Sequence, residues 1–205
     1  MQNLKQLRHG FVVLSLLSMA HAYAGVSYTD EMSVEFGEFY DNSSSYQDLL
    51  SVNTPHNNYA EVTIIGSSGS EIDIEQNHYG QGQNKAKVVQ HSSYSSKAVI
   101  NQAGSNNIGM IEQQGTNNFA YLEQTGRHHN SYISQDGNDN VAVLSQCSGW
   151  NCSSNYGSDI SIVQTNDSNE AYIFDKGGSS YGVEQDGNDS IVIISSMSRG
   201  IYVRQ

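Results

Sequence analysis

The chain has 205 residues, enough for one ordinary domain, with only 15% charged residues and one proline. Its formal net charge of −12 argues against a nucleic-acid partner, because phosphate binding requires clustered Lys and Arg and the nine basic residues are scattered. Abundant Asn, Gln, Ser and Gly are also found in disordered tracts. Here, however, Ile, Val and Leu recur at fixed positions, which favours a folded repeat.

Residues 1–24 predict a secretory signal peptide. Lys5 and Arg8 precede an apolar stretch, and small residues around Ala22 and Ala24 offer two cleavage sites. The apolar stretch is too short to span a bilayer. We therefore expect an exported chain, cleaved after either Ala22 or Ala24.

Residues 25–57 lack the repeat that fills the rest of the chain. This stretch places Tyr and Phe among Asp, Glu and Ser. We predict a mobile leader, which is either a recognition segment for export or a simple disordered terminus.

Residues 58–205 contain 13 copies of a seven-residue phrase, [Asn/Ser]-x-small/apolar-x-[Ile/Val/Leu]-x-Gln. Its regular positions alternate, which is the period of a β-strand, and glycine-containing turns follow most copies. In the most regular part, the closing glutamines recur every 11 residues. A fixed period over most of a chain indicates a stacked architecture. The predicted fold is therefore all-β, a two-sheet β-solenoid of the cross-β type in which two 11-residue strand-turn units form each coil.

The inward positions of this solenoid are predicted to hold an apolar core, amide ladders and turn glycines. Identical amides on successive coils can bond along the stack, which offsets the cost of burying them. The predicted core residues are Ile100, Ile111, Leu122, Ile133, Leu144, Ile162 and Ile173. In the twelfth copy, Ile194 is assigned to this position and Ser196 closes the phrase. The predicted ladder residues are Asn84, Gln90, Gln102, Asn107, Gln113, Asn118, Gln124, Gln135, Asn140, Gln146, Gln164, Asn169 and Gln185. The predicted turn glycines are Gly104, Gly115, Gly126, Gly137, Gly177 and Gly187.

An insertion at residues 147–157 interrupts the array and contains both cysteines, Cys147 and Cys152. Export makes a disulfide between them plausible. The alternative is two free thiols in a loop.

Two segments resemble the repeat of the curlin family, the secreted subunits of bacterial curli amyloid fibres. That repeat is Ser-x5-Gln-x-Gly-x2-Asn-x-Ala-x3-Gln. Gln113-Gln-Gly-Thr-Asn-Asn-Phe-Ala-Tyr-Leu-Glu-Gln124 and Gln135-Asp-Gly-Asn-Asp-Asn-Val-Ala-Val-Leu-Ser-Gln146 both follow it from its first Gln onward. The resemblance extends over roughly residues 58–205.

The resemblance implies a structural protein of an extracellular, cell-surface fibre that supports adhesion and biofilm matrix. The expected partners are other curlin subunits, the curli export channel and surface accessory proteins. The irregular, Arg-bearing C-terminus is similar to that of the minor subunit, which nucleates the fibre, and marks Arg199 and Arg204 as a candidate surface-attachment end. Two alternatives stay open: the major fibre subunit, and a monomeric extracellular β-solenoid adhesin that binds through exposed Tyr and Phe.

No set of nucleophile, base and acid is recognisable in the sequence, and we expect no enzymatic activity and no cofactor. The Gly/Asn/Asp turns lack the spaced carboxylates of a calcium loop. His129 stands where the repeat has Asn, beside His128 in a turn, which favours a tolerated substitution over a metal site.

Overall fold

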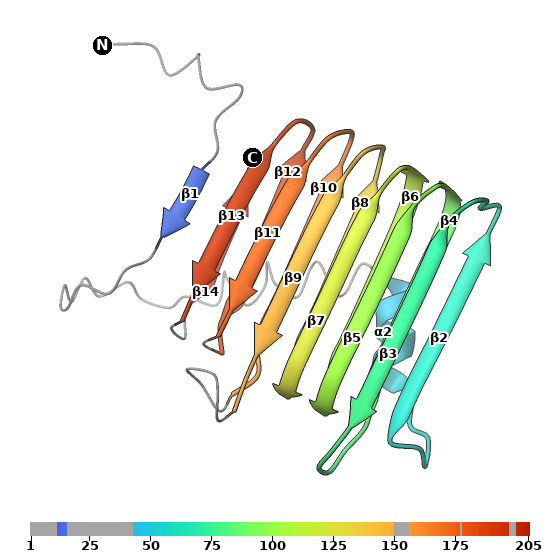
Figure 1. Ribbon diagram of the computed structural model, residues 1–205, viewed down its shortest axis with the longest axis vertical. Helices are drawn as coiled ribbons and strands as arrows, with labels where there is room; N and C mark the ends of the chain where they lie inside the picture. The colour runs from blue at the N-terminus through green and yellow to red at the C-terminus, as the bar shows by residue number, and fades with distance from the viewer. Residues whose placement is uncertain (1–11, 16–42, 150–155, 177, 197–199) are drawn as a thin grey trace.

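The computed structural model describes residues 12–15, 43–149, 156–176, 178–196 and 200–205, and its solenoid is formed by strands β2–β14 (Figure 1). Consecutive strands alternate between two parallel sheets, which lie face to face. One sheet has the order β14-β12-β10-β8-β6-β4-β2, and we call it the even sheet. The other has the order β1-β13-β11-β9-β7-β5-β3, and we call it the odd sheet. The strand bounds are β2 Asn58–Ile65, β3 Glu71–His78, β4 Asn84–Tyr94, β5 Lys97–Ser105, β6 Ile108–Thr116, β7 Phe119–Arg127, β8 Asn130–Asp136, β9 Val141–Cys147, β10 Asp159–Thr165, β11 Glu170–Asp175, β12 Ser180–Asp186, β13 Ser190–Ser195 and β14 Gly200–Arg204.

The 13 strands β2–β14 coincide with the 13 copies of the phrase. Corresponding positions of the repeat are hydrogen-bonded neighbours, so that Leu122 of β7 lies in register with Ile100 of β5 and Leu144 of β9. The prediction of a two-sheet β-solenoid is confirmed, and the solenoid has about six turns.

The core lies between the two sheets and consists mainly of the third and fifth residues of the phrases from β3 onward. In β7, Ala120, Leu122 and Gln124 are buried, whereas Phe119 and Tyr121 face outward and are half-buried. This alternation follows from the two-residue period of a strand. The structure buries all seven predicted core residues completely.

The twelfth copy is displaced by one residue from the predicted alignment. In β13, Ile193 lies in register with Ile173 and is buried, while Ile194 is 57% exposed and points outward. The assignment of Ile194 to the core was wrong, and Ser195 rather than Ser196 takes the closing position. The four residues from Ile191 to Ile194 are all aliphatic, so the sequence has no apolar–polar alternation that would show which of these side chains face the core.

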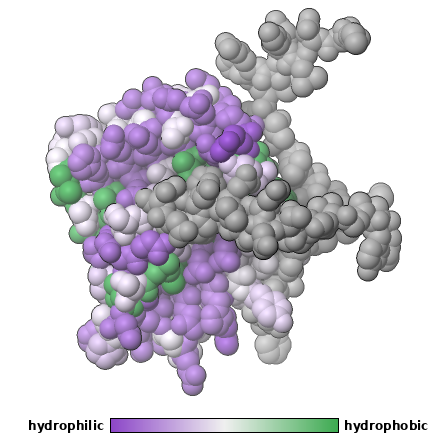
Figure 2. Space-filling model, turned by 180° about the vertical axis from the view of Figure 1, so that it is seen from behind, coloured by the Kyte–Doolittle hydropathy of each residue, from purple (hydrophilic) through white to green (hydrophobic). Residues whose placement is uncertain are grey.

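Residues 25–57 were predicted to be a mobile leader, but helix α2 (Ser44–Ser51) folds within them. Ser43 caps the helix by accepting a hydrogen bond from the Tyr46 backbone N–H at 3.2 Å. Tyr46 and Leu49 are buried against Met110 and Tyr132 on the outer face of the even sheet. Figure 1 shows α2 behind the sheets, and Figure 2 views the molecule from that side, where the coloured surface is mostly hydrophilic with separate hydrophobic patches. The apolar pair three residues apart was the signal for this helix.

A further strand, β1 (Val12–Ser15), pairs in parallel with β13 and extends the odd sheet by one strand (Figure 1). It belongs to the segment predicted to be removed as a signal peptide. Among the described residues, no helix is both long and apolar enough to cross a membrane.

Candidate functional site

The closing glutamines of the even sheet form a continuous ladder of side-chain hydrogen bonds. In each bond, Nε2 of one strand donates to Oε1 of the next strand toward the C-terminus. The bonds are 2.8–2.9 Å long, except for the last at 3.4 Å, and they join Gln90, Gln113, Gln135, Gln164, Gln185 and Gln205 in that order. The ladder therefore has a direction, with donors facing the C-terminal end.

The odd sheet has a shorter ladder, which links Gln76, Gln102, Gln124 and Gln146 at 2.7–3.1 Å. It ends where Asp175 follows Gln146 in register, and Ser195 follows Asp175. There the Gln146 amide donates to the backbone carbonyl of Ser158 instead, at 3.0 Å. The buried Asp175 carboxylate accepts a hydrogen bond from the Ser158 hydroxyl.

Seven of the ten ladder glutamines also tie the two sheets together. In each of the seven, Nε2 also donates across the core to a backbone carbonyl of the preceding strand. Gln124 donates to Ile108 O at 3.0 Å and Gln135 to Phe119 O at 3.1 Å. Both donors of these buried amides are therefore satisfied, which removes the main objection to glutamine in a narrow core.

The opening asparagines form the predicted amide bonds at two places, where Asn169 Nδ2 donates to Asn140 Oδ1 at 3.0 Å and Asn84 Nδ2 donates to Asn58 Oδ1 at 3.2 Å. Their more regular bonds are to the backbone. Each of the five Oδ1 atoms accepts a backbone N–H from the next strand of the same sheet, at 2.9–3.3 Å, and these residues are Asn84, Asn107, Asn118, Asn140 and Asn169. The Nδ2 atoms donate to turn carbonyls, as Asn118 does to Gly137 O at 2.8 Å. The asparagines therefore fasten the start of each strand to the turn of a neighbouring coil.

His129 replaces one asparagine of this series and reproduces both of its bonds. Its Nδ1 lies 3.1 Å from the backbone N of Ser158, and its Nε2 lies 3.1 Å from Thr125 O. These partners require Nδ1 to accept and Nε2 to donate, which defines a neutral ring. Burial lowers the pKa of His129 to about 4. The interpretation of His129 as a substituted asparagine agrees with this geometry.

Four of the predicted turn glycines, Gly104, Gly115, Gly126 and Gly137, lie where backbones of neighbouring coils approach closely. Gly104, Gly115, Gly126, Gly137 and Gly187 all have positive φ. A Cβ on Gly115 would lie 1.9 Å from Gly137 O, whereas one on Gly187 would have no neighbour nearer than 3.4 Å. Gly177 is outside the described residues. Gly115 is therefore required both for its φ and for space, and Gly187 only for its φ.

Cys147 ends β9 and is disulfide-bonded. Cys152, the partner predicted for it, is outside the described residues.

Serine hydroxyls complete the polar network at positions that the sequence pattern did not single out. Ser131 donates to Gln146 Oε1, and Ser96 accepts the backbone N–H of Asn118 at 3.1 Å. Ser158 accepts the backbone N–H of Ser179 at 3.2 Å. Ser96 and Ser158 stand at the opening position, where the phrase admits Ser as well as Asn, and that was the available signal.

The N-terminal end of the solenoid exposes residues that are core elsewhere. Val62 and Ile64 of β2 are 48% and 57% exposed although they occupy inward positions of the repeat. Gln90 Oε1 is buried without a partner, because Ile64 stands where a glutamine would donate to it. Strand β2 is the last strand of its sheet at this end.

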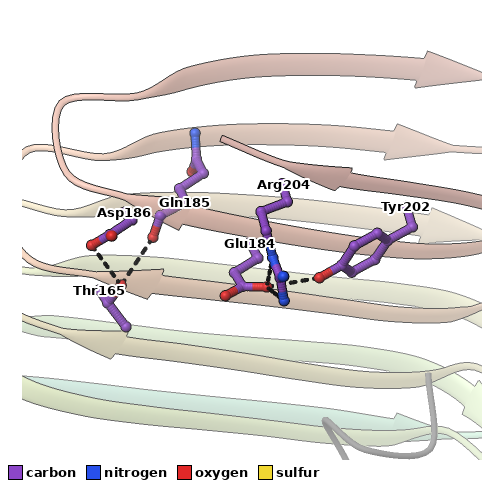
Figure 3. Close-up of polar contacts among 6 residues, drawn as sticks. All are labelled: Thr165, Glu184, Gln185, Asp186, Tyr202 and Arg204. Atoms are coloured by element: carbon purple, nitrogen blue, oxygen red, sulfur yellow. Dashed lines mark hydrogen bonds and ion pairs between the residues drawn. The ribbon is translucent and has the colours of Figure 1, made fainter. Parts of the chain in front are cut away.

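The C-terminal end carries a cluster of polar outward residues on β12 and β14 (Figure 3). Glu184 accepts a hydrogen bond from the Tyr202 hydroxyl at 2.7 Å and forms an ion pair with Arg204 at 2.6 Å. Burial and this bond raise the pKa of Tyr202 to about 12. Of the two arginines predicted to mark an attachment end, Arg204 is paired within the chain, and Arg199 is outside the described residues.

Comparison with known proteins identifies the repeat. Residues 104–137, from the end of β5 to the residue after β8, match the family model of the curlin associated repeat. The chain therefore contains a curlin repeat in this segment. No curated protein and no solved structure gives a match to it.

The curlin match coincides with the most regular coils, in which both ladders run and the glycine turns are tightest. These repeats build a rigid stack whose two ends are strand edges. What these ends can do is form hydrogen bonds with further strands. The glutamine ladders give those bonds a direction, because each Nε2 donates toward the C-terminal end.

Proposed function

We propose that this chain is a secreted structural subunit of a curli-type amyloid fibre at the cell surface. The observation that carries the proposal is the glutamine ladder of the even sheet, which runs through six strands from Gln90 to Gln205. An added strand with the same repeat would continue the ladder and satisfy backbone groups at the edge. Other curlin subunits are the partners that fit this edge, and fibre assembly supports adhesion and biofilm matrix.

Within this class, we propose the role of minor subunit, which nucleates the fibre by presenting a preformed edge. Pairing strands that are distant in sequence is slow, so a folded template shortens the lag before growth. The irregular β14 and its Arg204–Glu184 pair support this role, because they set the last coil apart from the regular repeats.

A seeding assay tests both statements. Fibre growth of a separate curlin-repeat subunit is followed by dye fluorescence, with and without a trace of the exported chain. We expect the lag to vanish at trace amounts while the chain alone forms little fibre. Ready polymerisation alone, with seeding no better than that of any fibre fragment, would assign it as the major subunit. Absence of fibre in every mixture would remove the assembly function and favour the adhesin.

A further inference from the structure

The repeat array has an odd number of strands, and this restricts how a second solenoid can continue it. Strands β2 and β14 lie in the same sheet, so the even sheet has one more repeat strand than the odd sheet. If the chain continued past Gln205, its next strand would lie on β13. The structure shows that this edge accepts a parallel strand, because β1 occupies it.

We propose that a second copy of this chain docks on the C-terminal end after a half-turn about the solenoid axis, with its β2 on β13 and its β3 on β14. The proposal rests on the assembly function proposed above and specifies its interface. A half-turn is required because the incoming β2 must enter the odd sheet, whereas it belongs to the even sheet of its own copy. Consecutive strands run in opposite directions, so the rotation exchanges the sheets and preserves parallel pairing.

Docking without rotation is less favourable for a geometric reason. It would place the incoming β2 on β14 and the incoming β3 two strand positions from β13. The empty position would leave the backbone donors and acceptors of β13 without partners beside a closed interface, which is costly. The half-turn leaves no such vacancy.

The inward residues of the two ends match in the rotated arrangement. Aligning the phrases places Ile74 of the incoming β3 on Val203, and Val62 of the incoming β2 on Ile193. Val62 is 48% exposed in the single copy and would be covered. This burial supplies a hydrophobic driving force for docking.

The polarity of the glutamine ladders also matches. Gln205 ends the even ladder as an acceptor, and its Nε2 donates to no glutamine of the described strands; Gln76 begins the odd ladder as a donor, and no glutamine of these strands donates to its Oε1. The half-turn places Gln76 on Gln205 and so joins the two ladders. It also places Ile64 on Ser195, which brings together two positions without an amide. Without rotation, Gln205 would meet Ile64 and lose its acceptor.

Outward charges agree with the same arrangement. Arg204 and Tyr202 of β14 would lie beside Glu75 and Asp73 of the incoming β3. Among the described residues, neither acidic residue forms an ion pair within the chain. An Arg–carboxylate pair between copies would favour this register over one in which Arg204 meets Thr63.

Intermolecular disulfides between variants that each carry one introduced cysteine test the arrangement. Neighbouring strands are ~4.8 Å apart, within the Cα separation of about 4.4–6.8 Å that a disulfide allows, whereas strands two positions apart are not. We expect the exported Arg204→Cys chain to crosslink with Glu75→Cys, and Ile194→Cys with Thr63→Cys. Arg204→Cys should not crosslink with Thr63→Cys, which is the pair that an unrotated stack brings together. Mass spectrometry defines the mature N-terminus and the crosslinked peptides, and circular dichroism confirms that each variant retains its strands.

The outcomes separate this proposal from the assembly function. Sedimentation of the unmodified chain, alone and with a curlin-repeat subunit, reports assembly by itself. If assemblies form but Arg204→Cys crosslinks with Thr63→Cys, or no pair crosslinks, the half-turn is wrong and assembly stands. If the unmodified chain assembles neither alone nor with the curlin-repeat subunit, the proposed function fails first. A full-length chain that retains β1 provides a second check, because we expect loss of the Ile194–Thr63 crosslink while β1 occupies the β13 edge.

Discussion

The coils around β5–β9 and the coils from β10 to β14 contain the same repeat. They differ in the continuity of their glutamine ladders and in how closely their turns pack. In the first region, both ladders are continuous and glycine turns touch the next backbone. In the second region, Asp175 ends the odd ladder, and a Cβ on Gly187 would make only ordinary van der Waals contact, with Asn166 Cβ at 3.4 Å. The even ladder alone is therefore sufficient to keep the strands in register as far as the C-terminus. Equivalent substitutions in the two regions should change the free energy of unfolding by different amounts.

The largest contrast is expected between two glycines. Gly115→Ala places a methyl group 1.9 Å from Gly137 O at a φ of +103°, and should cost ~3–4 kcal/mol of unfolding free energy from overpacking and backbone strain together. Gly187→Ala has only the strain of its φ, about 1 kcal/mol. Urea unfolding of freshly exported, unassembled chain measures both. Equal losses would show that close packing of the turns does not distinguish the regions.

In the region around β5–β9, acid should lower the free energy of unfolding through protonation of His129. Its folded pKa, about 4, is below the unfolded value of 6.5, so unfolding takes up a proton between these values. The contribution of His129 to stability is therefore complete above about pH 6.5 and declines as the pH falls, by ~3 kcal/mol near pH 4. Unfolding curves from pH 7.5 to pH 4 measure the decline.

His129→Asn provides the matched control, because asparagine is the repeat residue at this position. This variant should fold and should lose the acid-dependent component attributed to His129, while carboxylates contribute equally to both chains. An unchanged pH profile in the variant would assign the sensitivity to other groups.

Interrupting the even ladder should have an intermediate effect that depends on position. Gln135→Leu leaves the buried Gln113 donor and Gln164 acceptor without partners, which should cost ~2–4 kcal/mol at roughly 1–3 kcal/mol for each orphaned group. Gln205→Leu removes only the 3.4 Å contact at the end and should cost less than about 1 kcal/mol. Equilibrium unfolding compares the two, and similar values would contradict an energetic role for ladder continuity.

The alternation of the phrase was sufficient to predict the two sheets, the buried Leu122 and the stacking of Gln124 on Gln102, because both depend on a strand period and a fixed repeat. The sequence was less informative where the pattern is degenerate. The run from Ile191 to Ile194 carries no alternation, so its facing depends on packing with β11. Helix α2 depends on tertiary contact of Tyr46 and Leu49 with the sheet, which no repeat in the sequence reports.

The smallest effect on stability is expected from substitution of Arg204. This substitution nevertheless distinguishes an effect on folding from an effect on assembly. Its ion pair with Glu184 is at the surface, and the Arg204 side chain is 67% exposed, so Arg204→Ala should leave the unfolding free energy almost unchanged. If Arg204 contacts Glu75 of a second copy, the same substitution should slow assembly and make it less sensitive to salt, because screening weakens such pairs. Arg204→Lys retains the charge and should restore part of the rate. A variant that folds, assembles at the normal rate and keeps its salt dependence would show that the C-terminal arginine has no part in the interface.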